Sequence, residues 1–300
     1  MNSMYDVIVV GGGPAGLNAA IVLRRCLYKV LVFDKGEQRN IRAKGIHNFL
    51  TRDNLPPTEF LSIAHEELKK YEIEIKHQEI TTISSNKNVF TVVTNNAETY
   101  YSKKILLATG VKDCIPPLKG VEEFYGKSIF HCPYCDAWEL KNKKIGVYGK
   151  LVDGTGMSLI MTTWSPNITL FTDGKKYLRR KQKEQLAKNN IPFIIDPIKE
   201  LKGENGKLKA IVLENGKTVE CDALFFTNGL DQSCILAKQL GCKFDKKGIV
   251  ITDSLQKTNV KGLYIAGDAT RDMQFVIIAA AEGAKAAVAI HKELHEERME

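Results

Sequence analysis

Short apolar runs and stretches of helical periodicity alternate along the chain, and this alternation predicts an α/β protein. Residues 5–10 alternate with β-branched side chains and end in glycines, as a buried parallel strand does. Residues 14–27 carry apolar side chains at helical spacing behind a proline, which suits the first turn of a helix. Residues 29–33 read as the next strand and end at Asp34. The first part of the chain therefore predicts a strand–turn–helix–strand unit.

The same pattern recurs in the middle of the chain. A strand is predicted over residues 144–149, a helix follows to about Trp164, and residues 167–171 form another strand. Further helices are expected at 57–70 and from about 273 to 294. Further strands are expected at 73–76, 79–83, 88–93, 98–101, 105–110, 223–227 and 262–268. Because the strand–turn–helix pattern occurs twice, we expect two nucleotide-binding-type domains.

The first turn carries a complete Gly-x-Gly-x-x-Gly motif, formed by Gly11, Gly13 and Gly16. Such glycines permit a tight turn and let the backbone approach a diphosphate, which rests on the helix N-terminus. Asp34 ends the following strand, where a carboxylate takes the ribose hydroxyls of a dinucleotide. Because strand, turn, helix and acid occur in this order, the motif predicts a dinucleotide site rather than a chance glycine-rich turn.

A second candidate site is the segment Cys132-Pro133-Tyr134-Cys135-Asp136. Two cysteines at this spacing can open and close a disulfide, and proline between them is common in redox turns. A zinc site would need two more ligands at comparable spacing, and the remaining cysteines form no second pair of this kind. An inert structural pair is the other alternative, and Asp136 could be a solvated capping carboxylate.

Composition narrows the class of protein. At 300 residues, with 44% hydrophobic and 26% charged residues, the chain is typical of a globular protein with room for two domains. The net charge of +8 comes from scattered basic residues, which does not support nucleic-acid binding. We expect no membrane span and no signal peptide, and therefore a cytoplasmic protein whose seven cysteines are mostly reduced. Cys26, Cys114, Cys221, Cys234 and Cys242 are expected to be small buried apolar residues.

Four motifs, in this order and spacing, resemble those of the low-molecular-weight thioredoxin reductases and their flavoprotein relatives. They are GGGPAG at 11–16, ATG at 108–110, CPYCD at 132–136 and TNVKGLYIAGD at 258–268. The resemblance covers nearly the whole chain. It implies an α/β fold of two Rossmann-like, three-layer ββα domains, the second inserted in the first. It also implies a homodimer.

The resemblance further implies an FAD-binding domain made of residues 1–117 and 245–300. Residues 118–244 would form an inserted NAD(P)-type domain that carries the dithiol. The cofactor-binding positions it implies are Gly11, Gly13, Pro14, Ala15, Gly16, Asp34, Asn48, Thr109, Gly110, Gly267, Asp268, Gln274 and Phe275. By the same resemblance, Cys135 is the sulfur next to the flavin, Cys132 is the outer thiol that attacks a substrate disulfide, and Asp136 shuttles protons.

The second nucleotide motif departs from the family pattern. Counted from Gly149, its middle glycine is replaced by Leu151, whose side chain should obstruct a diphosphate; a turn shifted to 154–156 is the alternative. The family's His-Arg-Arg for NADPH is replaced by residues 172–174, Thr-Asp-Gly, although Lys175 and Lys176 could compensate in part. NADPH or NADH is therefore a doubtful reductant, and Asp173 would tolerate NADH better.

The motifs leave three functions open. The first is a thioredoxin-reductase-like enzyme that passes electrons from FAD through the Cys132–Cys135 dithiol to a protein disulfide such as thioredoxin. Its electron donor would be a nicotinamide, or a small acidic carrier such as ferredoxin or flavodoxin. The second is an FAD-dependent oxidase that forms disulfides in small dithiols with O2 as the acceptor. Asp136 counts against this second function, because related oxidases tend to carry histidine at that position. The third is a flavin-binding redox sensor without turnover.

Overall fold

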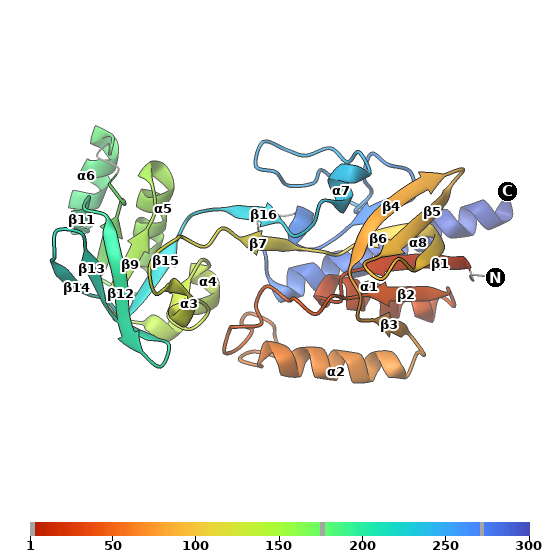
Figure 1. The fold of residues 1–300 in the computed structure, drawn as a ribbon, viewed down its shortest axis with the longest axis horizontal. Coiled ribbons are helices and arrows are strands. Elements are labelled where there is room, and N and C mark those ends of the chain that lie inside the picture. The colour runs from red at the N-terminus through yellow and green to blue at the C-terminus, as the bar shows by residue number, and fades with distance from the viewer. Residues whose placement is uncertain (1–3, 175–177, 271–272) are drawn as a thin grey trace. The chain divides into compact units, whose positions relative to one another are not determined.

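The computed structural model describes residues 4–174, 178–270 and 273–300. Contacts divide the chain into two compact units (Figure 1). The first unit contains Met1–Ile41, Asn48–Lys112 and Asp231–Glu300, and the second contains Arg42–His47 and Asp113–Leu230. The chain therefore leaves the first unit, forms most of the second and returns. An α/β fold with two Rossmann-like units, the second inserted in the first, is confirmed.

The first unit is built on a sheet in the order β3-β2-β1-β6-β5-β4, with β17 paired to β6. Its strands are β1 (Met4–Val10), β2 (Val30–Phe33), β3 (Glu74–Lys76), β4 (Ile80–Asn86), β5 (Val89–Thr94), β6 (Thr99–Leu107) and β17 (Leu263–Ile265). Strands β1, β2, β3, β6 and β17 run parallel, whereas β4, β5 and β6 pair antiparallel. The carboxyl ends of β1, β2, β6 and β17 therefore meet at one edge.

Strand β6 corrects the prediction of two separate strands at 98–101 and 105–110. It is continuous: residues 99–102 pair with β5, residues 101–107 pair with β1, and residues 105–107 pair with β17. The prediction left residues 102–104 between the two strands, but Ser102 and Lys104 are buried within β6. The strand also ends at Leu107, so Thr109 and Gly110 lie just beyond it.

Helices α1 (Pro14–Arg25), α2 (Pro57–Lys69) and α8 (Val276–Met299) belong to the first unit, with the short α7 (Leu236–Gln239). Helices α1 and α8 pack closely, since a Cβ at Gly283 would collide with the backbone of Ala15. Helix α8 begins three residues later and ends five residues later than the predicted 273–294. Within the described residues, no helix is long and apolar enough to cross a bilayer.

The second unit contains a parallel sheet in the order β11-β10-β9-β15-β8 and an antiparallel sheet in the order β12-β13-β14. Its parallel strands are β8 (Ile129–Phe130), β9 (Ile145–Tyr148), β10 (Ile168–Phe171), β11 (Phe193–Ile194) and β15 (Ala223–Phe226). Its antiparallel strands are β12 (Ile198–Glu204), β13 (Lys207–Leu213) and β14 (Thr218–Glu220). Its helices are α3 (Val121–Phe124), α4 (Pro133–Asp136), α5 (Leu151–Met161) and α6 (Arg180–Lys188), with a 3-10 turn η1 (Trp138–Leu140).

Helix α6 and the sheet β12-β13-β14 were not predicted. Helix α6 is dominated by charged side chains and buries only Gln182 and Leu186, so its apolar periodicity is faint. The chain passes from the first unit to the second through β7 (Val111–Asp113) and returns through β16 (Leu230–Gln232). These two strands pair with each other. Residues 231–244, expected in the inserted domain, belong to the first unit because α7 buries Leu236 and Ala237 among side chains of β4 and β5.

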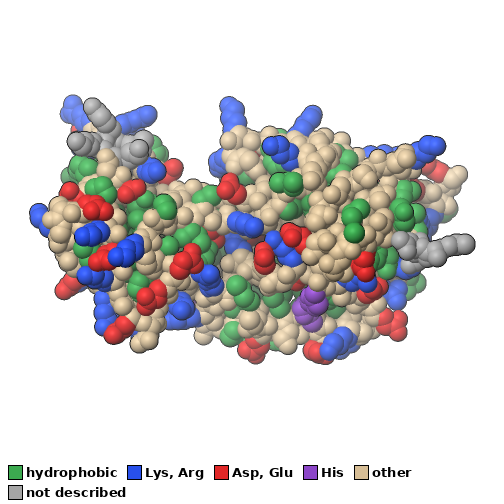
Figure 2. Space-filling view, in the orientation of Figure 1, with side chains coloured by type: hydrophobic (Ala, Val, Ile, Leu, Met, Phe, Trp, Pro, Cys, Tyr) green, Lys and Arg blue, Asp and Glu red, His purple; other side chains and the backbone are tan. Residues whose placement is uncertain are grey.

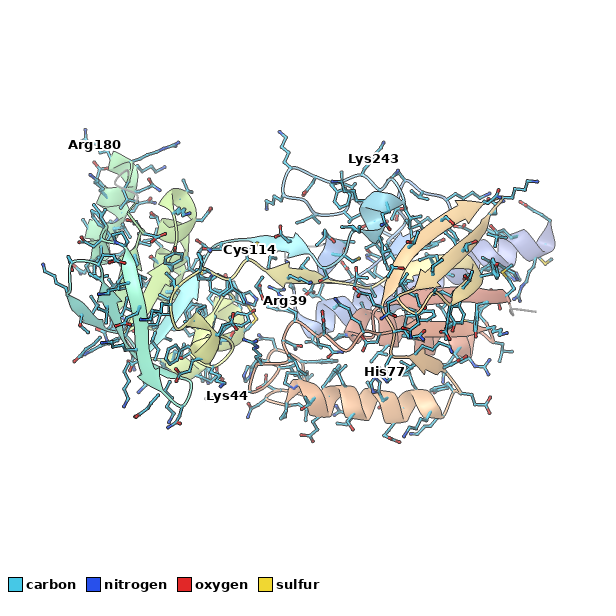
Figure 3. All side chains as sticks on the ribbon, in the orientation of Figure 1. Arg39, Lys44, His77, Cys114, Arg180 and Lys243 are labelled. Carbon is cyan, nitrogen blue, oxygen red and sulfur yellow. A yellow bond between two sulfur atoms is a disulfide. The ribbon has the colours of Figure 1, made fainter. Side chains whose placement is uncertain are left out.

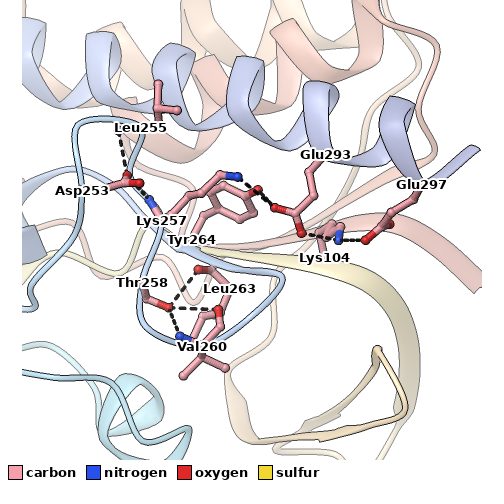
Figure 4. A network of polar contacts seen from close by, with 10 residues as sticks. All are labelled: Lys104, Asp253, Leu255, Lys257, Thr258, Val260, Leu263, Tyr264, Glu293 and Glu297. Atoms are coloured by element: carbon pink, nitrogen blue, oxygen red, sulfur yellow. Dashed lines mark hydrogen bonds and ion pairs between the residues drawn. The ribbon is translucent and has the colours of Figure 1, made fainter. Parts of the chain in front are cut away.

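A buried lysine ties the end of α8 to the sheet (Figure 4). The Lys104 side chain is only 3% exposed, and its amine lies 2.6 Å from carboxylate oxygens of both Glu293 and Glu297. The Tyr264 hydroxyl donates to the other oxygen of Glu293 at 2.5 Å. Burial alone would raise the pKa of Glu293, but the bonds from Lys104 and Tyr264 outweigh it and lower the pKa to about 2.

We expect Glu293→Gln to destabilise the protein by about 2 kcal/mol at pH 7, because a charge-assisted bond to a buried amine is lost. A carboxyl whose pKa is lowered by folding adds stability above its unfolded pKa, and that stability is lost as the pH falls toward 2. The difference between the proteins should therefore shrink below about pH 4. Urea unfolding midpoints at pH 7 and pH 3 measure this difference in stability. Glu297→Gln is the control and should have a smaller effect, because Glu297 is more exposed. An equal difference at both pH values would contradict this assignment.

Candidate active site

The glycine turn after β1 is shaped by close backbone contacts. Gly11 has φ of +113°, a region that favours glycine, and a Cβ there would collide with the Ala108 carbonyl oxygen. A Cβ at Gly16 would collide with the Gly11 carbonyl oxygen. The first and last glycines of the motif are therefore required by the protein's own backbone.

The middle glycine has a different surrounding. A Cβ at Gly13 would meet no protein atom within 4 Å. Gly13 is the N-cap of α1, makes no side-chain cap, and is followed by Pro14 at the first helical position and the buried Ala15. Open space in front of uncapped backbone N–H groups fits a diphosphate, which a helix N-terminus binds through those groups. The cradle fits the diphosphate of a dinucleotide.

Asp34 lies where β2 ends, beside this turn. It is buried, and a Cβ at Gly12 would overlap its carboxyl group. The Gly36 backbone N–H donates to Asp34 Oδ1 at 3.2 Å, and the Gln38 amide donates to Oδ2 at 3.0 Å. The segment that follows Asp34 therefore holds the carboxylate in position at the sheet edge. A carboxylate in this place can accept hydrogen bonds from ribose hydroxyls.

The end of β17 contributes a second acid. Gly267 has φ of +84°, and Asp268 opens the 3-10 turn η2 (Asp268–Thr270). Glu282 of α8, which the sequence did not single out, is buried and accepts bonds from the Gly267 backbone N–H at 2.9 Å and the Thr270 hydroxyl at 3.0 Å. This carboxylate holds the turn that presents Asp268.

Arg39 is a second residue that the sequence did not single out. Its Nη1 donates to Asp268 Oδ2 at 3.3 Å and to Gln274 Oε1 at 2.9 Å. Arg39 lies in the segment after β2 and carries no motif signal, so only the tertiary structure brings it to Asp268.

The remaining predicted cofactor positions lie in the first unit. Thr109 and Gly110 follow β6, and Gly110 has φ of +65°. Asn48 also has a positive φ, of +62°, and its backbone N–H donates to Asp53 at 2.9 Å. Phe275 is the N-cap of α8 and is half-buried, as is Gln274.

In the second unit, Cys132 and Cys135 are joined in a disulfide with their Cα atoms 5.3 Å apart. Cys132 is the N-cap of α4, whose first residue is Pro133. The Cys135 backbone N–H donates to the Cys132 carbonyl at 3.3 Å, which closes the turn. Both cysteines are half-buried. A half-buried disulfide in a tight turn can be reached by a reductant and by a substrate thiol.

Asp136 follows the disulfide directly. Burial, together with the nearby negative charge of Glu139, raises the pKa of Asp136 to about 7. The Glu139 carboxylate itself lies 3.7 Å from the His47 imidazole. Near neutral pH, a carboxyl group with this pKa is protonated in part of the molecules and ionised in the rest. It can therefore both donate and accept protons next to the disulfide in the sequence.

Two exposed aromatic side chains lie close to the disulfide in sequence. Tyr134, between the two cysteines, is 59% exposed and packs edge-on against Trp164 at 5.9 Å between ring centroids. Trp138 is 69% exposed, with the Lys141 amine 5.2 Å from its ring centroid. Exposed aromatic rings with a polar edge are typical of surfaces that bind partners.

The turn after β9 decides between the two alignments of the second nucleotide motif. A Cβ at Gly154 would lie 2.6 Å from the Gly149 carbonyl oxygen, the same relation that Gly16 has to Gly11. Gly154 and Gly156 both lie inside α5, so the alternative turn at 154–156 is wrong. Gly149, unlike Gly11, has no positive φ, and α5 already begins at Leu151, whose side chain lies outside the described part of the structure.

Asp173, at the end of β10, is engaged by the protein itself. The hydroxyl of Tyr148, the last residue of β9, donates to Asp173 Oδ2 at 2.6 Å. Burial and the bond to Asp173 raise the pKa of Tyr148, so the phenol keeps its proton. Thr172 is buried and its hydroxyl is directed to the Ile194 carbonyl. Lys175 and Lys176, expected to compensate for missing cations, lie outside the described residues.

The five other cysteines form no disulfide. Only Cys221 and Cys242 are buried, which corrects the prediction for Cys26, Cys114 and Cys234, since these are half-buried. Burial raises the pKa of Cys221 to about 12 and that of Cys242 to about 11, so both remain protonated thiols. Among the described residues, no three metal-binding side chains gather at one place.

Comparison with known proteins settles the family. Residues 5–283 match the model of the pyridine nucleotide-disulphide oxidoreductases. The chain belongs to this family. Members of the family use FAD, and the open Gly13 turn with Asp34 and Asp268 at one sheet edge fits that cofactor. The protein is a flavoprotein disulfide oxidoreductase.

Similar proteins span the whole chain. A "probable thioredoxin reductase" of Arthroderma benhamiae is 32% identical over 99% of this chain and 82% of its own. The crystal structure of a candidate thioredoxin reductase, TrxB, of Bacillus anthracis is 34% identical with a TM-score of 0.93, covering 98% of this chain and 99% of that one. The structure of HlmI is 29% identical with a TM-score of 0.94, covering 98% and 94%. These relatives support a thioredoxin-reductase-like oxidoreductase.

Proposed function

We propose that this protein is a disulfide reductase that passes electrons from FAD through Cys132 and Cys135 to a protein disulfide of the thioredoxin type. The observation that carries the proposal is the half-buried Cys132–Cys135 disulfide with a carboxyl group of pKa about 7 directly behind it. A structural disulfide has no need of a neighbouring group that exchanges protons at neutral pH, whereas thiol–disulfide exchange does.

FAD, when bound, supplies the two electrons that open the Cys132–Cys135 bond. Each sulfur gains one electron, and protonation gives the dithiol. The Cys132 thiolate then attacks one sulfur of the partner's disulfide, whose other sulfur leaves as a thiolate. Cys135 attacks Cys132, the mixed disulfide breaks, and the partner is released as a dithiol. The Cys132–Cys135 disulfide is thereby restored, and the partner has gained two electrons and two protons.

Asp136 is the proposed proton carrier in this exchange. As a carboxylate it accepts the proton of a cysteine thiol and so increases the thiolate fraction, which is about 3% for an ordinary cysteine at pH 7. As a carboxylic acid it then protonates the leaving thiolate of the partner. A pKa of about 7 serves both directions at neutral pH.

The exposed rings of Tyr134 and Trp138 favour a protein as the disulfide partner. Large exposed apolar side chains beside a reactive bond lose water when a partner covers them, which contributes to affinity. A thioredoxin-like protein presents its own disulfide at its surface and would cover this region. A small dithiol would leave most of the aromatic surface exposed.

For the electron donor we propose a small acidic carrier such as ferredoxin or flavodoxin in preference to NADPH. Asp173 occupies the position where cations would clasp the 2′-phosphate, and Tyr148 already donates to it. Each missing charge-assisted contact costs roughly 1.5–3 kcal/mol, or about 10- to 100-fold in affinity. A net charge of +8 favours encounter with an acidic carrier, although Figure 2 shows basic and acidic side chains interspersed on the face in view.

The donor can be identified by anaerobic mixing. We expect micromolar NADPH to leave the flavin absorbance unchanged, and photoreduced ferredoxin or flavodoxin to bleach it within the turnover time. Asp173→Ser should improve bleaching by NADPH more than by NADH, because only NADPH carries the 2′-phosphate that the carboxylate repels. Rapid bleaching of the unaltered protein by micromolar NADPH would contradict this choice of donor.

The dithiol oxidase is the second candidate, and the altered second nucleotide turn favours it because an oxidase needs no nicotinamide. It predicts rapid oxygen uptake with a small dithiol and no donor. A stopped-flow and oxygen-electrode comparison with reduced thioredoxin and a small dithiol separates the two candidates. We also propose a homodimer, which sedimentation of the holoprotein tests.

A further inference from the structure

A lysine-rich surface lies on residues 231–261, which lead from β16 to β17. This segment contains six lysines and three aspartates, with no arginine, histidine or glutamate, so it carries +3 of the chain's net charge of +8. Lys238, Lys243, Lys246 and Lys261 are exposed and form the lysine surface. Figure 2 shows basic side chains projecting from the part of the first unit where Figure 1 labels α7, and Figure 3 labels Lys243 there.

Hydrogen bonds hold these lysines on one continuous stretch of the fold. The Lys243 backbone N–H donates to the Asn259 side chain at 2.9 Å, and the Asn259 amide donates to the Gly241 carbonyl at 3.0 Å. The Gly241 N–H in turn donates to the Lys238 carbonyl at 3.1 Å. The other two lysines lie within three residues of Lys243 or of Asn259 along the chain. The four positive charges therefore belong to one local surface.

The charge of this surface is not neutralised by nearby acids. Within the part of the chain that the structure describes, no carboxylate forms an ion pair with any of the four amines. Lys35 and Lys104 of the same unit, in contrast, are both paired with glutamate. Asp245, between Lys243 and Lys246, accepts bonds from backbone N–H groups at 2.8 and 3.0 Å. Unpaired charges of one sign create a local potential that attracts a partner of the opposite sign.

The same segment packs against the turn that presents Asp268. The Val250 N–H donates to the Ala269 carbonyl at 3.1 Å, and the Gln232 amide donates to the carbonyls of Ala269 and Gly248 at 3.1 and 3.0 Å. Ala269 follows Asp268 in η2, at the sheet edge proposed to hold FAD. An electron carrier has to come close to the flavin, so a surface next to this edge suits it. Helix α6 is also basic, but it belongs to the second unit.

We propose that the lysine surface is the docking site of a small acidic electron-carrier protein that reduces the bound FAD. This inference rests on the electron donor named in the proposed function. Two carriers deliver one electron each for every disulfide that is reduced, and the two protons come from water. The amines attract acidic side chains of the carrier. Ile251 is 50% exposed and donates its N–H to the Lys243 carbonyl at 2.9 Å, so it offers an apolar contact among the charges.

The test is the rate of flavin reduction by photoreduced ferredoxin, followed anaerobically by stopped flow. We expect Lys243→Glu/Lys246→Glu to lower the second-order rate constant by about 10-fold or more at low salt, because electrostatic steering raises association rates by about 10- to 1,000-fold. The difference should shrink between about 10 mM and about 1 M salt, as the screening length falls from about 30 Å to about 3 Å. Lys238→Glu/Lys261→Glu alters the rest of the surface and should show a similar loss.

The matched control is Lys181→Glu/Lys183→Glu, which makes the same change in net charge on exposed residues of α6 and should keep the normal rate. An equal loss in this control, or unchanged rates in both variants of the lysine surface, would overturn the inference. A changed sedimentation coefficient in those variants would also overturn it, because the surface would then contact a second copy of the chain. If photoreduced ferredoxin and flavodoxin both fail to reduce the unaltered protein, the donor in the proposed function is wrong, and the docking site with it.

Discussion

Cys135→Ser should abolish disulfide reduction, with turnover falling by at least about 1,000-fold, because a serine hydroxyl can neither form a disulfide nor act as a leaving group. Cys132→Ser should be equally inactive. The two variants should nevertheless differ. In Cys135→Ser, Cys132 remains to attack the partner but cannot be resolved, so a stable mixed disulfide should accumulate, which intact-protein mass spectrometry detects. In Cys132→Ser, the remaining Cys135 thiolate should give a charge-transfer absorbance band with the flavin.

The control for both is Cys114→Ser, because Cys114 is a half-buried cysteine outside the disulfide and should be dispensable (Figure 3). If the mixed disulfide accumulates in Cys132→Ser and the absorbance band appears in Cys135→Ser, the roles of the two sulfurs are reversed. If both variants retain turnover, the disulfide is structural and the proposed function is wrong.

Asp136→Asn should have the next largest effect, a loss of about 100- to 10,000-fold in the rate of disulfide reduction, the usual contribution of a positioned acid or base. The asparagine amide retains the size of the side chain but exchanges no proton. In the unaltered protein, the pH profile of the rate should show an ionisation near 7, the raised pKa of Asp136, and this ionisation should be missing in the variant. A profile with the same ionisation in both proteins would assign it to another group.

Glu139→Gln is the matched control for this ionisation. Its like charge helps to raise the pKa of Asp136, so the inflection should move to lower pH while the rate at pH 7 changes little. An inflection that stays in place would show that Glu139 does not act on Asp136. Glu139 also lies 3.7 Å from the His47 imidazole, so the pH profile of the rate should be measured for His47→Gln as well.

Stability should respond to Asp136 in the opposite direction from activity. Folding raises the pKa of this carboxyl, so the folded state keeps a proton that the unfolded state loses between about pH 4 and pH 7. Its contribution to stability is therefore lost as the pH rises through that window. Asp136→Asn should be more stable than the unaltered protein at pH 8, by about 1–3 kcal/mol, and equal to it near pH 4. Thermal unfolding at the two pH values measures the difference.

Local patterns predicted the parts of the fold that depend on neighbours in sequence. The alternation over residues 5–10, the glycines that follow and the acid at Asp34 are consecutive signals, and β1, α1 and β2 follow them closely. The prediction failed where a buried charged residue is neutralised by residues far away in the sequence. The predicted strands at 98–101 and 105–110 left Lys104 between them, yet it lies inside β6, where Glu293 and Glu297 of α8 neutralise its charge.

The sequence alone determined the chemistry available to this protein: two cysteines in one short turn, a carboxyl behind them, and a glycine cradle before a helix. Covalent spacing and backbone sterics decide these features, and both are local. The tertiary structure decided the pKa of Asp136, the bond that occupies Asp173, and the presence of Arg39 beside Asp268. Each of these depends on burial or on charges brought together from distant positions, and electrostatic energies are set by distance in space rather than along the chain.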